Sequence, residues 1–204
     1  MDDEPDWLKP RGSGWTVNAA RPVQDNPWFA VTTYDAVAPT GAPAAYHVLG
    51  FKNWAVGVLP LHDDGTVTLV GQWRFPFGTY SWEIPEGGAP KSEDPLDGAK
   101  RELREEAGLV AAEWRHILTM QLSNASSDEV ALGFLASGFT LIDKEPDATE
   151  ALTSVRVPFR EALSAAVRGR IQDSITVAML LRVHHMAYEG ELPQAMARKI
   201  LGRD

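Results

Sequence analysis

The 204-residue chain contains no cysteine. Disulfide bonds and metal sites built from thiolates are therefore excluded, and a reducing, cytoplasmic environment is expected. No apolar run approaches the roughly 18–20 residues that a membrane-spanning helix needs, so a membrane partner is not expected either. The acidic and polar start of the chain, MDDEPDWLKPRG, does not resemble a secretory signal.

Clusters of lysine and arginine are also missing from the sequence. Binding to a phosphate backbone depends on such clusters, and the chain has a formal net charge of −9. We therefore expect no nucleic-acid partner. An anionic small ligand would need its charge neutralised locally, and a divalent cation is the obvious means.

The remaining composition is that of a globular protein with a real core, 44% apolar and 23% charged. Residues 1–26 are rich in Pro, Gly, Asp and Arg, and they are expected to form a mobile arm. Residues 76–95 are expected to form a loop. The order of the elements predicts an α+β fold, an α/β/α sandwich on a mixed sheet. Strands are expected at 28–37, 44–51, 53–61, 66–75, 114–120, 130–139 and 152–158, and helices at 95–107, 159–168, 173–188 and 192–201.

The helix at 95–107 has an unusual charge pattern. Its start is predicted by Asp94 and Pro95 and its end by Gly108. Leu96, Ala99, Leu103 and Ala107 share the face that should pack on the sheet. Glu102 and Glu106 lie one turn apart beside that face, with Glu105 just round from them, and Arg101 can pair with Glu105. Carboxylates at this spacing repel each other unless a cation lies between them, and Mg²⁺ takes oxygen ligands of this kind.

At this point the sequence resembles a known family. Residues 87–109, GGAPKSEDPLDGAKRELREEAGL, match the Nudix box: Gly, five residues, Glu, seven residues, then Arg-Glu-aliphatic-x-Glu-Glu-x-Gly-aliphatic. The resemblance implies the Nudix sandwich fold and hydrolysis of a nucleoside diphosphate linked to another group. It implies Glu102, Glu105 and Glu106 as metal ligands or their immediate partners, with Mg²⁺ as the cofactor or Mn²⁺ in its place. It also implies a metal contact from the backbone carbonyl of Glu86, and structural roles for Gly87, Glu93, Arg101 and Gly108.

The flanking segments resemble one branch of this family, the ADP-ribose and nucleoside-diphosphate-sugar pyrophosphatases. Residues 70–88, VGQWRFPFGTYSWEIPEGG, carry a similar aromatic-Arg segment followed by Trp-Glu-aliphatic-Pro. Residues 26–37 resemble the extra N-terminal sheet of that branch, which often builds a dimer. The resemblance therefore implies an antiparallel β extension within residues 1–50, a Nudix hydrolase domain over 51–204, and a homodimer formed through the N-terminal strands.

Two residues outside the box are candidates for substrate contact. Arg74 is a candidate for the diphosphate or the base, and the alternative is an arginine held in a salt bridge on its strand. Trp28 is a candidate for stacking on a nucleobase, and the alternative is packing in a core or an interface. Phe75, Phe77 and Trp82 are assigned to packing.

The segment LSNASSDEVALGF, residues 122–134, resembles in part a loop that brings a carboxylate over the scissile diphosphate in this branch. Ser127, Asp128 and Glu129 match the end of that loop, so Glu129 is the candidate general base or an additional metal ligand. The alternative is an acidic residue that simply opens a strand. Asn124 and Ala125 stand where the branch usually has Pro-Gly, a feature associated with ADP-ribose, which makes another nucleoside diphosphate sugar more credible as the substrate.

Other functions remain open at this stage. The first is hydrolysis of nucleoside triphosphates or dinucleoside polyphosphates by the same box. The second is a binding module that senses a nucleotide sugar without cleaving it, although such a module should have lost box carboxylates. The third is an acidic helix with a purely structural role.

Overall fold

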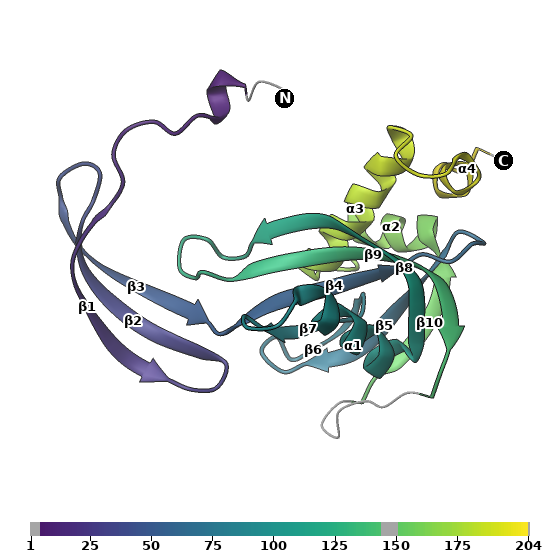
Figure 1. Cartoon of the computed structure of the whole chain (residues 1–204), viewed down its shortest axis with the longest axis horizontal. Helices are drawn as coiled ribbons and strands as arrows, with labels where there is room; N and C mark the ends of the chain where they lie inside the picture. The colour runs from purple at the N-terminus through teal and green to yellow at the C-terminus, as the bar shows by residue number, and fades with distance from the viewer. Residues whose placement is uncertain (1–4, 144–150, 204) are drawn as a thin grey trace. The chain divides into compact units, whose positions relative to one another are not determined.

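The structure, a computed structural model, describes residues 5–143 and 151–203. The chain divides into two compact units. The first contains Met1–Lys52 and Ser123–Asp128, and the second contains Asn53–Leu122 and Glu129–Asp204. Figure 1 labels the helices and strands of both units.

The first unit is an antiparallel meander. After a short 3₁₀ helix, η1 (Asp6–Leu8), it contains β1 (Thr16–Asp25), β2 (Phe29–Val37) and β3 (Pro43–Phe51), in the spatial order β1-β2-β3. The segment 123–128 joins β3: the Leu49 backbone N–H donates to the Ser126 carbonyl at 2.9 Å, and Asp128 Oδ1 accepts from the Phe51 N–H at 2.7 Å. The predicted N-terminal antiparallel strands are thus present.

The prediction of a mobile arm over residues 1–26 was wrong for β1. Residues 1–4 lie outside the described part, but Thr16–Asp25 pairs along its whole length with β2. Pro22 is the reason that the sequence did not suggest a strand, since proline cannot donate a ladder hydrogen bond. It is tolerated here because β1 is an edge strand and its register shifts between Pro22 and Gln24.

The second unit contains two sheets and four helices among its described residues. One sheet has the order β7-β4-β9-β8, in which β4 and β9 are parallel and the other neighbours are antiparallel. The other has the order β10-β5-β6 and is antiparallel throughout. The bounds are β4 (Asn53–Pro60), β5 (Thr66–Arg74), β6 (Thr79–Glu83), β7 (Glu86–Pro90), α1 (Pro95–Ala107), β8 (Leu109–Gln121), β9 (Val130–Leu141), β10 (Thr153–Pro158), α2 (Phe159–Val167), α3 (Ser174–Tyr188) and α4 (Gln194–Leu201).

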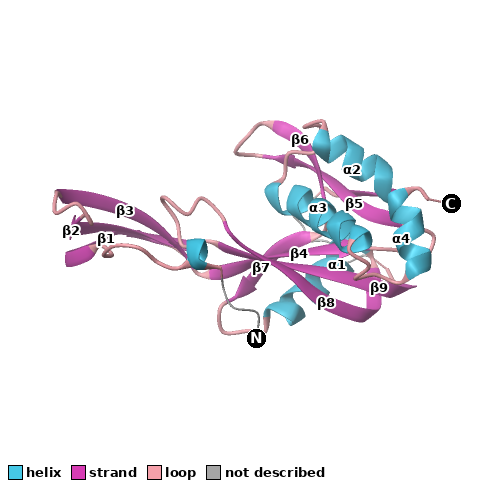
Figure 2. Cartoon of the chain, turned by 90° about the horizontal axis from the view of Figure 1, so that it is seen from above, coloured by secondary structure: helices cyan, strands magenta, loops and turns pink. Residues whose placement is uncertain are grey.

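The side chains of β4 contribute to two separate cores, because successive side chains of a strand point to opposite faces of the sheet. Val56 and Val58 pack in one core with Leu103 of α1. Leu59 lies in a second core with Met179 of α3. Figure 2 shows α1 on one side of the sheet and α2, α3 and α4 on the other. The predicted α+β sandwich with a mixed sheet is confirmed.

Helix α1 spans the predicted range. Asp94 Oδ1 accepts a hydrogen bond from the Leu96 N–H at 2.9 Å, which is an N-cap. Gly108 ends the helix in the left-handed conformation, with φ 65°, which glycine adopts at little cost. Ala99, Leu103 and Ala107 are buried as expected.

The predicted loop at 76–95 contains two strands that the sequence did not reveal. β6 forms a hairpin with β5, and β7 pairs with β4, so partners elsewhere in the fold decide both strands. The assignment of Phe75 and Phe77 to packing was wrong, because they lie at the hairpin turn and are 96% and 81% exposed. Trp82 packs against the core as expected.

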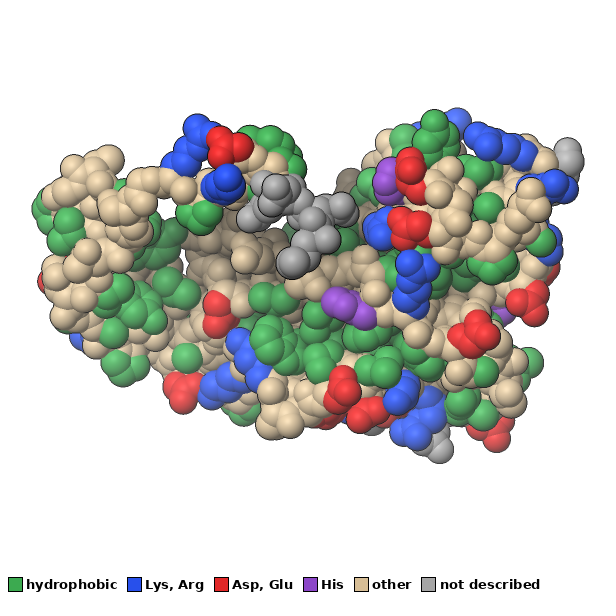
Figure 3. All heavy atoms as spheres, turned by 45° about the horizontal axis from the view of Figure 1, so that its top comes forward, with side chains coloured by type: hydrophobic (Ala, Val, Ile, Leu, Met, Phe, Trp, Pro, Cys, Tyr) green, Lys and Arg blue, Asp and Glu red, His purple; other side chains and the backbone are tan. Residues whose placement is uncertain are grey.

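Figure 3 shows one face of the molecule, where basic and acidic side chains are intermixed. Among the described residues, none of the helices is both long enough and apolar enough to cross a membrane.

Candidate active site

The close approach of α1 to β7 sets the geometry of the site. A Cβ atom at Gly98 would lie 2.5 Å from Ala89 Cβ, and a Cβ atom at Gly87 would lie 2.3 Å from Glu102 Cδ. Glycine at these positions lets the helix and the Glu102 carboxylate reach the backbone of β7. This contact is a physical reason for the glycine that begins the Nudix box.

Arg101 ties the loop before α1 to the helix. Its Nη1 donates to Glu93 Oε1 at 2.7 Å, and its Nη2 donates to the Gly88 carbonyl at 3.0 Å. The hydrogen bond to Glu93 is the main reason that the pKa of Arg101 is raised above its ordinary value. The short ion pair is thus with Glu93 rather than with Glu105, whose charge adds to the same effect at longer range.

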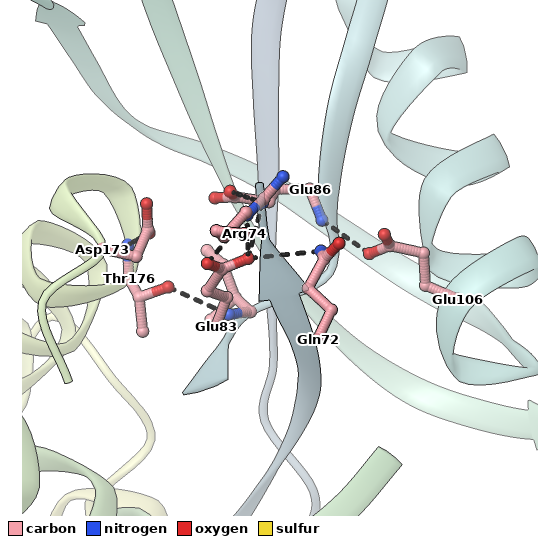
Figure 4. A network of polar contacts seen from close by, with 8 residues as sticks. Gln72, Arg74, Glu83, Glu86, Glu106, Asp173 and Thr176 are labelled. Atoms are coloured by element: carbon pink, nitrogen blue, oxygen red, sulfur yellow. Dashed lines mark hydrogen bonds and ion pairs between the residues drawn. The ribbon is translucent and has the colours of Figure 1, made fainter. Parts of the chain in front are cut away.

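Glu106 is a buried carboxylate that supports the chain before the box. It is 2% exposed, and its Oε2 accepts a hydrogen bond from the Glu86 backbone N–H at 2.9 Å. Figure 4 shows this bond crossing from α1 to the start of β7. Glu106 therefore anchors the backbone of Glu86, the residue whose carbonyl is predicted to contact a metal.

Arg74 forms ion pairs with two acidic residues. Its Nε donates to Glu83 Oε1 at 2.9 Å, and its Nη2 donates to Glu83 Oε2 at 2.5 Å and to Glu86 Oε1 at 2.6 Å. Burial by itself lowers the pKa of Arg74, but the hydrogen bonds to Glu83 and the charge of Glu86 raise it above its ordinary value. The salt-bridged alternative for Arg74 is thus present in this structure, while its contact with substrate stays a prediction.

The side chain of Glu86 lies in strongly negative surroundings (Figure 4). Oxygen atoms of Glu83, Glu86 and Asp173 lie within 4.8 Å of one another. Glu86 Oε2 is buried and has no hydrogen-bond partner within the described part of the chain. Burial, followed by the charges of Asp173 and Glu83, raises the pKa of Glu86 well above its ordinary value. A proton or a cation would satisfy this oxygen.

These three carboxylates differ from the ligand set expected from the box. Glu83 and Asp173 were not singled out in the sequence, and only the backbone of Glu86 was. Glu83 offered one signal, since it is a charged residue between the apolar residues Trp82 and Ile84. Asp173 lies 90 residues further along the chain, at the N-terminus of α3. Because Arg74 already pairs with Glu83 and Glu86, we interpret this group as an ion-pair cluster that supports the site.

The structure places the other predicted residues as follows. The Glu102 side chain is 15% exposed beside Gly87, and Glu105 is half-buried on the same helix. Glu129 is half-buried directly before β9, and its carbonyl accepts from the Leu122 N–H at 2.9 Å. In the first unit, Trp28 is 66% exposed. Their functional roles stay predictions.

Comparison with known proteins agrees with this geometry. Residues 52–175 match the family model described as the NUDIX domain. The chain is 35% identical to an ADP-ribose pyrophosphatase of Mycobacterium tuberculosis over 64% of each protein, so the match spans just under two thirds of that relative. It is 32% identical to an ADP-ribose pyrophosphatase of Bacillus subtilis over 70% of this chain and 77% of the relative.

A solved structure, described as an ADP compounds hydrolase, has the same fold. The two superpose with a TM-score of 0.78 over 90% of this chain and 100% of the other, at 19% sequence identity. The box, its position along β7 and α1, the family model and the relatives all agree. The chain therefore belongs to the NUDIX domain family.

Proposed function

We propose that this protein hydrolyses the diphosphate linkage of ADP-ribose or a related nucleoside diphosphate sugar with the help of Mg²⁺. The products would be a nucleoside monophosphate and a sugar phosphate. The observation that carries this proposal is the assembly of the box, in which Glu102 and Glu106 reach the backbone of β7 at Gly87 and Glu86. The names of the relatives, both ADP-ribose pyrophosphatases, support the substrate class.

The residues present fit a hard divalent cation. Mg²⁺ prefers oxygen ligands, usually one or two carboxylates completed by substrate phosphates and water. Glu102 and Glu106 supply carboxylates of this kind beside the backbone of β7, and they are only 15% and 2% exposed. We propose that Glu102, Glu105, Glu106 and the Glu86 backbone carbonyl hold the ion. When bound, Mg²⁺ would neutralise the phosphates and acidify the attacking water.

The chain's own residues would then have distinct tasks. Glu106 accepts a hydrogen bond from the Glu86 N–H and so anchors the backbone of the residue whose carbonyl would contact the ion. Glu129 would accept the proton of the attacking water, a role that requires its carboxylate to lie within hydrogen-bond reach of that water. The water oxygen would bond to one phosphorus, and the bridging oxygen would leave with the other phosphate. In a chain of net charge −9, binding an anionic diphosphate needs such local compensation.

The sugar attached to the diphosphate is a separate question. Asn124 and Ala125 replace the Pro-Gly that accompanies ADP-ribose in this branch, which favours another nucleoside diphosphate sugar. The test is incubation with Mg²⁺ and a panel of ADP-ribose, ADP-, UDP- and GDP-sugars, dinucleotides and triphosphates, with the products identified by mass. Cleavage of triphosphates alone would contradict the proposed substrate class.

Substitution of Glu106 tests the role of the box. Glu106→Gln keeps an oxygen that can accept from the Glu86 N–H but removes the charge, so we expect the fold to persist while turnover falls by about 100-fold or more. Glu113→Gln is a matched control, because Glu113 is an exposed carboxylate of β8 that accepts from Ser137 Oγ at 2.9 Å. A near-normal rate in Glu106→Gln would remove the proposed metal role.

We also propose that the protein is a homodimer formed through its N-terminal strands. All ten residues of β1 are exposed in the single chain, and β1 is the edge of its sheet. Val17 and Val23 on this strand are 57% and 62% exposed. Exposed edge strands with apolar side chains favour pairing with another chain, which supports an interface there.

A further inference from the structure

The short segment between β6 and β7 is held by three separate elements. The Ile84 N–H donates to Thr176 Oγ1 of α3 at 2.9 Å. The Val58 N–H of β4 donates to the Pro85 carbonyl at 2.9 Å. The Glu86 N–H donates to Glu106 Oε2 of α1 at 2.9 Å. Each of the three consecutive residues is thus fixed by a different part of the second unit.

The contact with α3 is fully buried. Thr176 and Ile84 are both 0% exposed, so water cannot replace the hydroxyl as the partner of the Ile84 N–H. Thr176 itself is fixed at the start of its helix, because Asp173 Oδ2 accepts from the Thr176 N–H at 2.7 Å. Figure 4 shows Asp173 and Thr176 on the side of Glu83 opposite to Glu106.

Pro85 stiffens the backbone between Ile84 and Glu86, because its φ angle is fixed and a proline also restricts the residue before it. The Thr176 contact is thus one of three hydrogen bonds that together hold a stiff segment. Its loss frees the Ile84 end of that segment. Two residues on lies the Glu86 carbonyl, which the proposed function makes a metal contact.

We propose that Thr176 is a positioning residue of the active site. Through the Ile84 N–H it holds the 84–86 backbone, so that the Glu86 carbonyl keeps its place relative to the carboxylates of Glu102 and Glu106. This proposal rests on the proposed metal site. It assigns to α3, which carries none of the box residues, a direct part in setting the geometry of cation binding.

The test compares Thr176→Val with Thr176→Ser. Valine keeps the shape of threonine but removes the hydroxyl, whereas serine keeps the hydroxyl. Mn²⁺ affinity is measured by electron paramagnetic resonance, without substrate. We expect Thr176→Val to weaken Mn²⁺ binding by about 10-fold or more, the range seen when residues that orient a metal ligand are lost. Thr176→Ser should stay within about 3-fold of the wild type, and the metal concentration for half-maximal hydrolysis should follow the same order.

Thr68→Val is the matched control. Thr68 is also a buried threonine, and its hydroxyl shares a 2.8 Å hydrogen bond with His62 Nε2, away from the 84–86 segment. Thr68→Val should lower the melting temperature, as Thr176→Val should, but leave Mn²⁺ affinity unchanged. Equal loss of affinity in both variants would mean general destabilisation and would overturn the proposal.

Other outcomes separate this proposal from the proposed function. Unchanged Mn²⁺ affinity in Thr176→Val overturns the positioning role while the box remains a metal site. Failure of the wild-type protein to bind Mn²⁺ overturns the metal site and the positioning role with it. If Thr176→Val does not fold, Thr176→Ala and Thr176→Ser make the same comparison, since they differ only by the hydroxyl, and equal affinity in that pair contradicts the proposal.

Discussion

Replacement of Gly87 by alanine should separate cation binding from folding. Gly87 lies in β7, and its backbone does not have the positive φ that would penalise alanine. The added Cβ would lie 2.3 Å from Glu102 Cδ and 2.5 Å from Glu102 Oε1. Ordinary contact begins near 3.4 Å, so the Glu102 carboxylate has to move by about 1 Å.

The magnitudes follow from what has to move. The obstacle is the end of a flexible side chain, so the strand keeps its place. Gly→Ala at a compatible position restricts the unfolded chain and stabilises by about 0.4–1 kcal/mol, which offsets part of the cost of moving the carboxylate. We expect the free energy of unfolding to change by about 1 kcal/mol or less. Mg²⁺ and its ligands are about 2.0–2.1 Å apart with little tolerance, so a shift of about 1 Å removes Glu102 as a ligand.

The assay measures both properties on the same preparation. Urea unfolding gives the stability, and Mn²⁺ titration gives the affinity, which should fall by about 10-fold, or about 1.4 kcal/mol. Gly88→Ala is the control in the same strand, because its Cβ would meet Asn53 Nδ2 at 2.9 Å and displace an amide instead of a carboxylate. Unchanged Mn²⁺ affinity in a folded Gly87→Ala protein would refute the proposed part of Glu102 in cation binding.

Two further predictions concern other parts of the chain. Burial, followed by the charge of Arg156, lowers the pKa of His62 below its ordinary value. Near that pKa the folded state therefore binds fewer protons than the unfolded state. The contribution of His62 to the free energy of unfolding should be constant above about pH 6.5 and fall as the pH drops below it. His62→Gln should flatten this dependence in urea unfolding between about pH 5 and 8, and an unchanged slope would contradict the assignment. The double substitution Val17→Lys and Val23→Lys should convert the proposed dimer to a monomer with little loss of stability. Light scattering after gel filtration measures the mass, and a variant that keeps the mass of a dimer would contradict this prediction.

Local sequence was sufficient to predict helix α1. Asp94, Pro95 and Gly108 act on the backbone within a few residues of their own positions, and the helix begins and ends as they indicate. The apolar face was equally predictable, because the helical period alone decides which side chains share it. The Nudix box could be recognised for the same reason, because its residues follow one another along one strand end, one loop and one helix.

Prediction was weaker wherever a strand depended on its partner. β1, β6 and β7 look irregular in the sequence because of Pro22, Gly78 and Gly87, and each becomes a strand by pairing with β2, β5 or β4. Phe75 and Phe77 were expected inside, but their exposure is set by the position of a hairpin turn. The period of hydrophobic residues does not reveal which strand supplies the missing hydrogen bonds.

The family, the acidic helix and the two ends of that helix could be read from the amino-acid sequence. The pairing of Arg74 with Glu83 and Glu86, and the hold of Thr176 on the Ile84 N–H from 92 residues away, depend on how the chain packs. The physical reason is the range of the interactions. Caps and helical periodicity act within a few residues, whereas ion pairs and buried hydrogen bonds depend on packing that brings distant segments together.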